Sequence, residues 1–401
     1  MGRMARQQVA AWLAALAAAW LVLAALGYSS RDADSRLYAE IAARMADAPA
    51  AGWIAPDAPP GSYLSGPFRE HPAGLFWPAA LLARLGYPAG QAAYAMNALY
   101  QAATLVLLAL LAASLVPDRE ARALAWLLQL LPIAFTYRAR ANHEAALLLG
   151  LVLALLGTEL SRRRARWAAL TAAGLVWMLL VKGVFAALGP PVCALWLVAS
   201  RRDPERRTRA AWVGLAAAVL ATAAAALVYE HLYRLATGEP FGSLYLARQL
   251  GVAAAAEMQL AQNEAWRKAA NVLFYVGRIL WFAFPWSLAL LLAALRRRGS
   301  TTREPAGPDE RGHAVGALFV AGAALVYVIA FSLFDRRADR YVFPAYYAVG
   351  AGGAIAALRL WPRWCRLAEA LDRPWAPAAV FWLLLVAHVL AGRLGVPTIK
   401  L

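Results

Sequence analysis

The sequence has little charge and little cysteine, and both shortages narrow what the protein can be. Asp, Glu, Lys and Arg make up only 16% of the 401 residues, and 62% are hydrophobic. An ordinary soluble domain is about a quarter charged, so this balance disfavours a soluble globular protein. The two cysteines, Cys193 and Cys365, fit neither a disulfide framework nor a metal-binding spacing. The net charge of +17 comes from short basic clusters rather than a continuous basic face, so we expect no nucleic acid partner.

Long uncharged hydrophobic segments dominate the chain. About 20 apolar residues in a helix suffice to cross a bilayer, so each such segment predicts a membrane-spanning helix. We predict eleven, near residues 8–27, 92–116, 121–137, 144–160, 167–181, 184–199, 210–228, 271–295, 313–334, 341–359 and 375–391. The expected fold class is therefore an all-α polytopic integral membrane protein. Residues 1–401 are expected to form a single transmembrane domain, with the first segment as a retained anchor and no separate soluble C-terminal domain.

The distribution of basic residues predicts the orientation in the membrane. Cytoplasmic loops carry an excess of Lys and Arg. Here 22 of the 40 Lys and Arg residues fall in the N-terminal tail and near 119–122, 162–166, 201–209, 296–311 and 359–373. We therefore expect a cytoplasmic N-terminus and a C-terminus on the opposite face. The Arg- and Ala-rich composition suggests a bacterial source, for which we expect the inner membrane, with the opposite face in the periplasm. The two long loops, 28–75 and 229–270, then face the periplasm.

The first long loop begins with an amphipathic pattern. Residues 31–47 read RDADSRLYAEIAARMAD, with apolar Leu37, Ile41 and Met45 recurring every fourth position. This spacing predicts an amphipathic helix at the membrane surface. Asp34 comes just before the first of these apolar residues, where it is either a helix N-cap or a catalytic carboxylate held at the membrane surface. The two roles are compatible.

A second segment of the same loop, residues 66–77, reads GPFREHPAGLFW. Its prolines and glycines prevent a regular helix, so Arg69, Glu70 and His71 are expected close together at the membrane interface. A purely structural loop that re-enters the membrane has the same pattern, and this segment alone does not separate the two interpretations.

Both segments resemble motifs of the GT-C glycosyltransferases that use polyprenyl-phosphate sugars, the group of the lipid A aminoarabinose transferase and the protein O-mannosyltransferases. Residues 34–42, DSRLYAEIA, are similar to the family's Asp-Glu-x-x-Tyr-Ala-Glu-Ile-Ala motif, with Asp34 at the position of the catalytic acid. Residues 70–75, EHPAGL, are similar to its Glu-Lys-Pro-Pro-Leu motif, with His71 in place of the lysine.

Three later segments follow the same family pattern in order. Residues 180–183, LVKG, are similar to Leu-Thr-Lys-Gly, and residues 284–286, FPW, to Leu-Pro-Trp. Residues 331–334, FSLF, and 339–344, DRYVFP, are similar to the family's Phe-Ser and Lys-Arg-Tyr-Leu-Leu-Pro elements. On these motifs the chain is identified as a member of the GT-C group.

The resemblance implies an inverting hexosyl- or pentosyltransferase. It would move a monosaccharide from a polyprenyl-phosphate donor to a lipid A, glycan, lipid or protein acceptor on the periplasmic face. Such a reaction needs a base, here Asp34, and cations that stabilise the departing phosphate. The candidate phosphate ligands are Lys182, Arg340, Tyr341, Arg138 and Arg140. The candidate substrate-binding residues are Asp32, Tyr38, Arg69, Glu70, His71 and Glu144.

Other interpretations of these residues remain open. Each arginine is also explained as an interfacial residue whose head reaches water, whereas Lys182 is one of only three lysines and interrupts a hydrophobic segment before a glycine. The sequence requires no cofactor, although Asp34, His143 and Glu144 are candidate ligands for a divalent metal. The competing class is a non-enzymatic flippase or transporter of a lipid-linked sugar. Against it, the candidate polar groups gather at one face rather than at the membrane midplane.

Overall fold

The computed structural model describes residues 3–62, 64, 66–200, 208–247, 264–299, 308–334 and 337–394. Within these ranges the chain is helical or irregular, apart from one isolated bridge between Asp57 and Pro67. The expected all-α fold class is therefore confirmed. The first half contains α1 (Arg3–Ala25), α2 (Ala33–Asp47), α3 (Ala50–Ile54), η1 (Ala73–Leu75), α4 (Trp77–Arg84), α5 (Ala89–Ala112), α6 (Asp118–Leu127), η2 (Leu128–Leu130), α7 (Pro132–Thr136), α8 (His143–Ser161) and η3 (Ala165–Trp167). The second half contains α9 (Ala168–Lys182), η4 (Gly183–Leu188), α10 (Gly189–Ala199), α11 (Thr208–Thr237), α13 (Glu264–Phe282), α14 (Trp286–Gly299), α15 (Pro308–Ser332), η6 (Asp339–Val342), α16 (Phe343–Leu360), α17 (Pro362–Ala370) and α18 (Ala376–Arg393).

The expected count of eleven membrane-spanning helices is not confirmed. Within the described ranges, eight segments are long and apolar enough to cross a membrane, or nine if the sharply bent pair α13 and α14 forms one span. The expected spans at 167–181 and 184–199 lie in one apolar segment, Ala165–Ala199. The expected span at 121–137 is divided among α6, η2 and α7, because Pro132 cannot continue the preceding helix and instead begins a new one.

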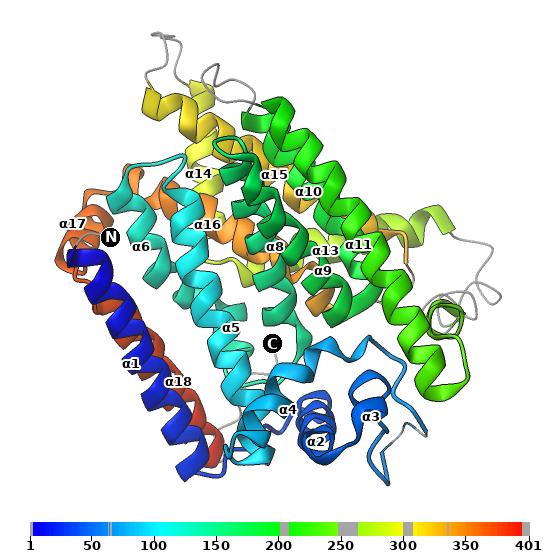
Figure 1. Ribbon diagram of the computed structural model, residues 1–401. Helices are drawn as coiled ribbons and strands as arrows, with labels where there is room; N and C mark the ends of the chain where they lie inside the picture. Colours follow the sequence, from blue (N-terminus) through cyan, green and yellow to red (C-terminus); the bar gives the residue numbers. More distant parts are fainter. Residues whose placement is uncertain are drawn as a thin grey trace.

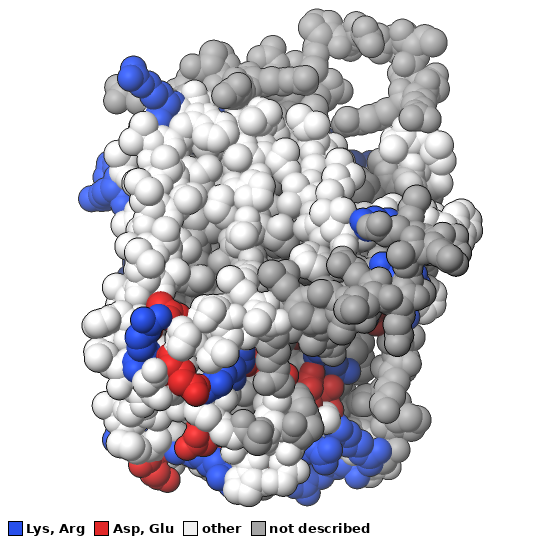
Figure 2. All heavy atoms as spheres, turned by 90° about the vertical axis from the view of Figure 1, so that its right-hand side faces the viewer, with Lys and Arg blue, Asp and Glu red and all other residues white. Residues whose placement is uncertain are grey.

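The long helices form a bundle that is closed at one end by the first long loop. Helices α1 and α18 pack together along one side, while α8 packs against both α5 and α9. Helices α2, α3 and α4 lie together below the bundle in Figure 1, and we call this the loop end. Figure 2 shows a broad uncharged band on the described surface, with Asp and Glu gathered toward the loop end and Lys and Arg both there and toward the opposite end. This distribution fits an apolar belt surrounded by lipid.

Helix α2 has the amphipathic character that its spacing predicts. Leu37, Ile41 and Met45 are buried against α4 and α5, whereas Glu40 and Arg44 form an exposed ion pair on the opposite face. The helix therefore packs onto the bundle through one stripe and faces outward through the other.

The second long loop begins later than expected. Residues 229–237 continue α11 as a helix, because Tyr229 and Tyr233, one turn apart, are buried against Phe241 and Tyr245 of a short helix over 241–247. Residues 264–270 already belong to α13. The central part of the expected loop, residues 248–263, lies outside the described residues.

Candidate active site

Eight side chains predicted from the sequence meet at the loop end of the bundle. They form what we call the polar cluster: Asp34 and Tyr38 of α2, His71 of the first loop, His143 and Glu144 of α8, Lys182 of α9, and Arg340 and Tyr341 of η6. Contacts join neighbouring members, from the Asp34–Arg340 ion pair to the rings of His71 and His143, whose centroids lie 4.8 Å apart. The cluster thus unites five chain segments that are distant in sequence.

Asp34 lies in the first turn of α2, paired with Arg340. Both side chains are 26% exposed, so the pair is open to a ligand from one side. Asp34 is not the N-cap of α2. That residue is Asp32, whose Oδ2 accepts a hydrogen bond from the backbone N–H of Ser35 at 3.0 Å. The capping interpretation of Asp34 is therefore wrong. Its carboxylate instead forms the ion pair with Arg340.

Glu144 and Lys182 form a buried ion pair in the centre of the cluster. Their side chains are 1% and 2% exposed, and Lys182 Nζ lies 3.7 Å from Glu144 Oε1. His143 Nε2 lies 2.9 Å from the same oxygen. Among the described residues, Lys182 Nζ and both Glu144 oxygens lack a hydrogen-bond partner with good geometry. Unpaired buried polar atoms are rare and indicate a place for a ligand or water.

The position of Lys182 depends on two glycines. Helix α9 ends at Lys182 because Gly183 has a φ of +57°, a left-handed conformation that favours glycine. Gly74 lets the irregular segment 66–77 pack directly on the end of α9, since a Cβ at this position would lie 2.6 Å from the Cβ of Leu180. The expectation that this segment forms no regular helix is borne out except at η1 and at its end, where Trp77 begins α4.

His71 and Tyr38 border the charged groups but are themselves neutral. Burial, together with the nearby His143 and the charges of Lys182 and Arg340, holds the pKa of His71 well below its usual range. Burial and the carboxylate of Asp34 raise the pKa of Tyr38 well above its usual range. His71 therefore does not replace the positive charge of the lysine that the family motif carries at this position.

Arg138 lies apart from the polar cluster. Its fully buried guanidinium donates to the backbone oxygen of Gln129 at 3.2 Å and lies 5.5 Å from the ring centroid of Phe381. It therefore packs between η2 and α18, so we withdraw it as a phosphate ligand.

Arg140 also has a different partner from the one expected. Its guanidinium lies 3.6 Å from Asp32 and over the ring of Tyr137 at 4.6 Å. Asp32 and Arg140 thus support the start of α2 next to the cluster.

Of the neighbouring residues 69 and 70, only one borders the cluster. Arg69 donates to the hydroxyl of Tyr233 at 3.0 Å and pairs with Glu239, which ties the first loop to the end of α11. Glu70 lies close enough to Tyr38 for its charge to contribute to the raised pKa of that hydroxyl. Arg69 therefore connects the first loop to the end of α11, whereas Glu70 lies at the edge of the cluster.

The candidate metal ligands do not assemble into a metal site. In the part of the chain that the structure describes, no three His, Cys, Asp or Glu side chains are arranged to hold a metal ion. His143 and Glu144 are adjacent, but Asp34 is paired with Arg340 instead.

Ser35 and Asn142 support the cluster, and the sequence analysis did not single them out. Ser35 Oγ donates to Asn142 Oδ1 at 2.5 Å and accepts from the backbone N–H of Ala141 at 3.2 Å. These bonds fix the start of α2 against the start of α8, and therefore Asp34 relative to Glu144. The available sequence signal was a polar Asn immediately before a long apolar helix.

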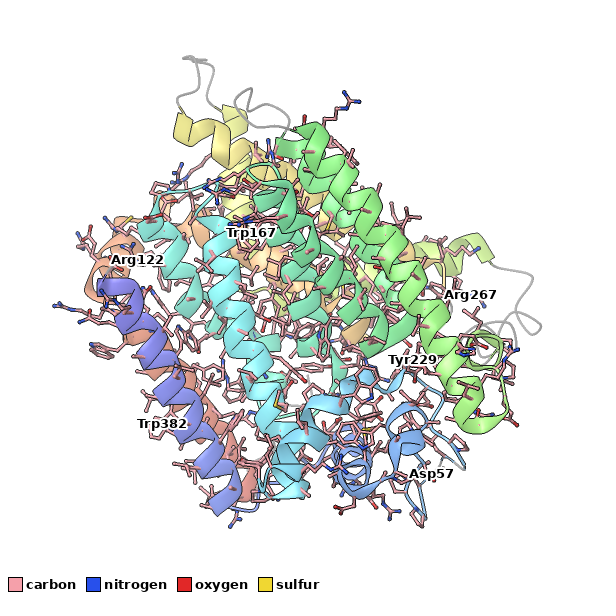
Figure 3. The ribbon with its side chains drawn as sticks, viewed as in Figure 1. Asp57, Arg122, Trp167, Tyr229, Arg267 and Trp382 are labelled. Atoms are coloured by element: carbon pink, nitrogen blue, oxygen red, sulfur yellow. The ribbon has the colours of Figure 1, made fainter. Side chains whose placement is uncertain are left out.

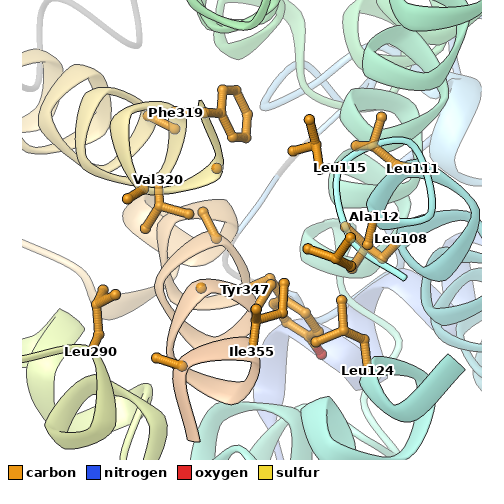
Figure 4. Close-up of a pocket in the computed structure, with 18 of the residues that line it drawn as sticks. Leu108, Leu111, Ala112, Leu115, Leu124, Leu290, Phe319, Val320, Tyr347 and Ile355 are labelled. Atoms are coloured by element: carbon orange, nitrogen blue, oxygen red, sulfur yellow. The ribbon is translucent and has the colours of Figure 1, made fainter. Parts of the chain in front are cut away.

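A large apolar cavity lies within the helix bundle. Its volume is about 640 Å³, and it lies among α5, α8, α10, α14, α15 and α16 (Figure 4). Leu148 and Pro344, which line it, follow Glu144 and Arg340 by one helical turn. The residues labelled in Figure 4 are aliphatic apart from Phe319 and Tyr347, so the cavity suits a hydrocarbon chain rather than water.

The stick view in Figure 3 shows Tyr229 near the loop end of the bundle, beside the first loop.

Comparison with known proteins agrees with this architecture. Residues 70–229 match the family model described as dolichyl-phosphate-mannose-protein mannosyltransferase. No curated protein matches the chain in sequence.

Solved structures share its fold. ArnT from Cupriavidus metallidurans bound to undecaprenyl phosphate is 16% identical with a TM-score of 0.63, and the match covers 97% of this chain and 77% of ArnT. ArnT in the apo state is 17% identical with the same TM-score and coverage. The Archaeoglobus fulgidus oligosaccharyltransferase in complex with Zn and sulfate is 14% identical with a TM-score of 0.51, covering 94% of this chain and 53% of that protein. The resemblance expected from the sequence is thus confirmed: the chain is similar to the GT-C glycosyltransferases in fold over nearly its whole length, and in sequence over residues 70–229.

Proposed function

We propose that this multi-pass membrane protein is an inverting glycosyltransferase that moves a monosaccharide from a polyprenyl-phosphate carrier to an acceptor at the periplasmic face of a bacterial inner membrane. The observation that carries the proposal is the polar cluster itself. A partly exposed carboxylate, Asp34, lies beside two cations, Arg340 and Lys182, and an apolar cavity is lined by residues one helical turn beyond Glu144 and Arg340. The similar fold of ArnT, which was crystallised with undecaprenyl phosphate, supports a donor of this class.

Asp34 is the proposed general base. An acceptor hydroxyl or amine gives its proton to the Asp34 carboxylate while its oxygen or nitrogen forms a bond to the anomeric carbon of the sugar. The bond between that carbon and the phosphate oxygen breaks, and its electron pair leaves with the polyprenyl phosphate. Inversion at the anomeric carbon is taken from the resemblance to the family.

Arg340 and Lys182 are the proposed phosphate ligands. The phosphodiester of the donor carries one negative charge, and the departing phosphate monoester gains a second as the bond breaks. Fixed cations in a site that excludes water stabilise this added charge. The guanidinium of Arg340 matches phosphate oxygens in a bidentate geometry, and Tyr341 next to it offers a hydroxyl donor.

The Asp34–Arg340 ion pair fits this division of roles. A donor phosphate would compete with Asp34 for Arg340, and its binding would leave the carboxylate free to accept a proton. The base would then become available when the donor is present.

The hydrophobic tail of the donor is proposed to occupy the apolar cavity. A polyprenyl chain needs an apolar path that starts at the phosphate, and the lining residues Leu148 and Pro344 begin one turn from Glu144 and Arg340. The proposed acceptor is an envelope molecule, which is lipid A, a glycan, another lipid or a protein. The zinc in the crystals of the archaeal oligosaccharyltransferase leaves a divalent metal as an optional cofactor.

Mass spectrometry of a gene-deletion strain tests this function. The strain is complemented with the native protein, with Asp34→Asn or with Glu40→Gln, at matched expression, and its envelope lipids, glycans and glycoproteins are compared. Glu40→Gln removes a carboxylate from the same helix but at an exposed ion pair, so it is the matched control. We expect one species to lose a single sugar in the deletion strain and to regain it with the native protein and the control.

Asp34→Asn should fail to restore that sugar. Asp32, rather than Asp34, caps α2, so the variant keeps the helix start while it loses the base. Equal restoration by Asp34→Asn would contradict the proposed base. If no glycan changes in the deletion strain, the proposed transferase function is contradicted.

A further inference from the structure

Tyr245 contacts the backbone at the junction between α9 and η4, where Lys182 lies. Its ring is buried and stacks on Phe241 at a centroid distance of 5.2 Å. Its hydroxyl donates to the backbone oxygen of Lys182 at 3.1 Å and accepts from the backbone N–H of Val184 at 3.2 Å. One side chain, 63 residues away in sequence, thus bridges both sides of Gly183.

The Tyr245 hydroxyl lies close to the backbone at the junction between α9 and η4. Helix α9 ends at Lys182 and η4 begins at Gly183, so backbone groups at this point lose their regular helical partners. A Cβ at position 183 would lie 2.5 Å from the Tyr245 hydroxyl, so glycine is needed for the approach as well as for the φ of +57°. Burial raises the pKa of Tyr245 to about 12, so the hydroxyl keeps its proton at neutral pH and can donate and accept at once.

The lysine itself is held by few contacts. Its Nζ lies 3.7 Å from Glu144 and 4.2 Å from the ring centroid of Phe185, and among the described residues it has no hydrogen-bond partner of good geometry. The direction of the side chain therefore depends on where the backbone of residues 182 and 183 is fixed. The Tyr245 hydroxyl bonds this backbone on both sides of Gly183.

We propose that Tyr245 is a positioning residue that aims the ammonium group of Lys182 at the donor phosphate. This inference rests on the proposed function of Lys182. It extends the site to the short helix over 241–247, which follows α11. Together with α11, this helix packs against residues of the first long loop. Tyr245 acts through Lys182 and makes no contact with the reacting atoms.

The test compares two lipid probes that differ only in the phosphate. Affinities for undecaprenyl phosphate and for undecaprenol are measured with purified protein in nanodiscs, using intrinsic fluorescence or native mass spectrometry. Tyr245→Phe removes one oxygen atom and keeps the ring stack on Phe241. We expect about twofold to tenfold weaker binding of undecaprenyl phosphate, the range for one lost hydrogen bond, and unchanged binding of undecaprenol.

A double-mutant cycle separates positioning from general support of the fold. In a Lys182→Met background, Tyr245→Phe should cause no further loss, because the group that it positions is already absent. The matched control is Tyr229→Phe. The Tyr229 hydroxyl also bridges two backbone groups in the same aromatic cluster, accepting from Ala73 at 2.9 Å and donating to Ile54 at 3.0 Å, but at another place. Any effect of Tyr229→Phe should add to that of Lys182→Met.

The possible failures are distinguishable. If the wild-type protein binds both lipids equally, the phosphate site and the proposed function fail together with the positioning role. If the wild type prefers undecaprenyl phosphate and Lys182→Met loses that preference, but Tyr245→Phe keeps it, the positioning role alone is overturned. Additive losses in the cycle also overturn it. If Tyr245→Phe does not yield folded protein, the positioning role is overturned, because the hydroxyl then supports the fold rather than the phosphate site alone.

Discussion

Replacing Lys182 by methionine should affect phosphate binding and stability by different routes, and the structure allows the two effects to be separated. Methionine has nearly the length and apolar stem of lysine but lacks the charge. The substitution removes the ammonium from the buried pair with Glu144, and a thioether contact replaces the cation–π contact with the Phe185 ring.

The loss of stability follows from the carboxylate that stays behind. Two unit charges at the observed 3.7 Å attract each other by about 4 kcal/mol at an effective dielectric constant of about 20. Breaking a buried ion pair by removing one partner typically costs about 3–5 kcal/mol, because the other charge is then buried without compensation. We therefore expect Lys182→Met to lower the stability of the protein by about 3 kcal/mol or more.

A second substitution should restore that stability without restoring function. Lys182→Met combined with Glu144→Gln leaves a neutral amide beside His143 in place of an isolated carboxylate. Most of the lost stability should return, since neither buried charge is left alone. Binding of undecaprenyl phosphate should stay weak, because the phosphate still lacks its ammonium partner.

The assay is apparent thermal stability in detergent, followed by the affinities for undecaprenyl phosphate and undecaprenol. Lys268→Met serves as the control, since it removes the same charge from α13. The reasoning is refuted if Lys182→Met leaves the preference for undecaprenyl phosphate intact. It is equally refuted if the double variant is no more stable than the single one.

Three further predictions concern other parts of the molecule. The pKa of His71 is low in the fold but about 6.5 in the unfolded chain, so protons bind preferentially to the unfolded chain below pH 6.5. Below pH 6.5, thermal stability should therefore decrease as the pH is lowered, by at most about 1.4 kcal/mol per pH unit. His71→Gln should reduce this pH dependence, and an unchanged dependence would contradict the prediction. Asp372 pairs with Arg122, labelled in Figure 3, and this hydrogen bond lowers the pKa of Asp372, so its contribution is present above about pH 4 and is lost as pH falls further. Because both side chains are more than a quarter exposed, Asp372→Asn should cost only about 0.5–1 kcal/mol at neutral pH by thermal unfolding, and a larger cost would show that the pair is more strongly coupled. Ala348→Phe fills part of the apolar cavity and should weaken binding of undecaprenyl phosphate several-fold more than binding of short-chain citronellyl phosphate, whereas equal losses would exclude the cavity as the tail site.

The sequence was sufficient to predict the main members of the polar cluster. Asp34, Lys182 and Arg340 each stand next to a hydrophobic segment, and each belongs to a motif in the family's order. A charged residue in such a position is costly unless it has a partner or a function, which is why these residues were recognisable. Their convergence needed the structure, since no local pattern states that α2 and η6 lie together.

The errors in the sequence analysis have local physical causes. Asp32 and Asp34 are both good capping residues, and which of them caps depends on α2 starting at Ala33 rather than two residues later. Arg138 and Arg140 are separated by one residue, but the irregular backbone between α7 and α8 directs the first into the bundle and the second toward Asp32.

Long-range contacts of ordinary residues could not be predicted at all. The bond of Tyr245 to the Lys182 turn and that of Ser35 to Asn142 join positions 63 and 107 residues apart. Tyrosine and serine are common in such loops and caps, so nothing in the local sequence distinguishes these two from the rest.

The central claim is that the sugar leaves its carrier in this protein, and counting reaction products tests it directly. Purified protein is reconstituted with lipid-linked sugars and acceptor-containing membrane extract from the source organism, and mass spectrometry follows both lipids over time. We expect one polyprenyl phosphate to appear for each sugar transferred with the wild-type protein, and almost none with Asp34→Asn. Movement of intact lipid-linked sugar between the two leaflets, without any polyprenyl phosphate, would contradict the account and identify a carrier instead.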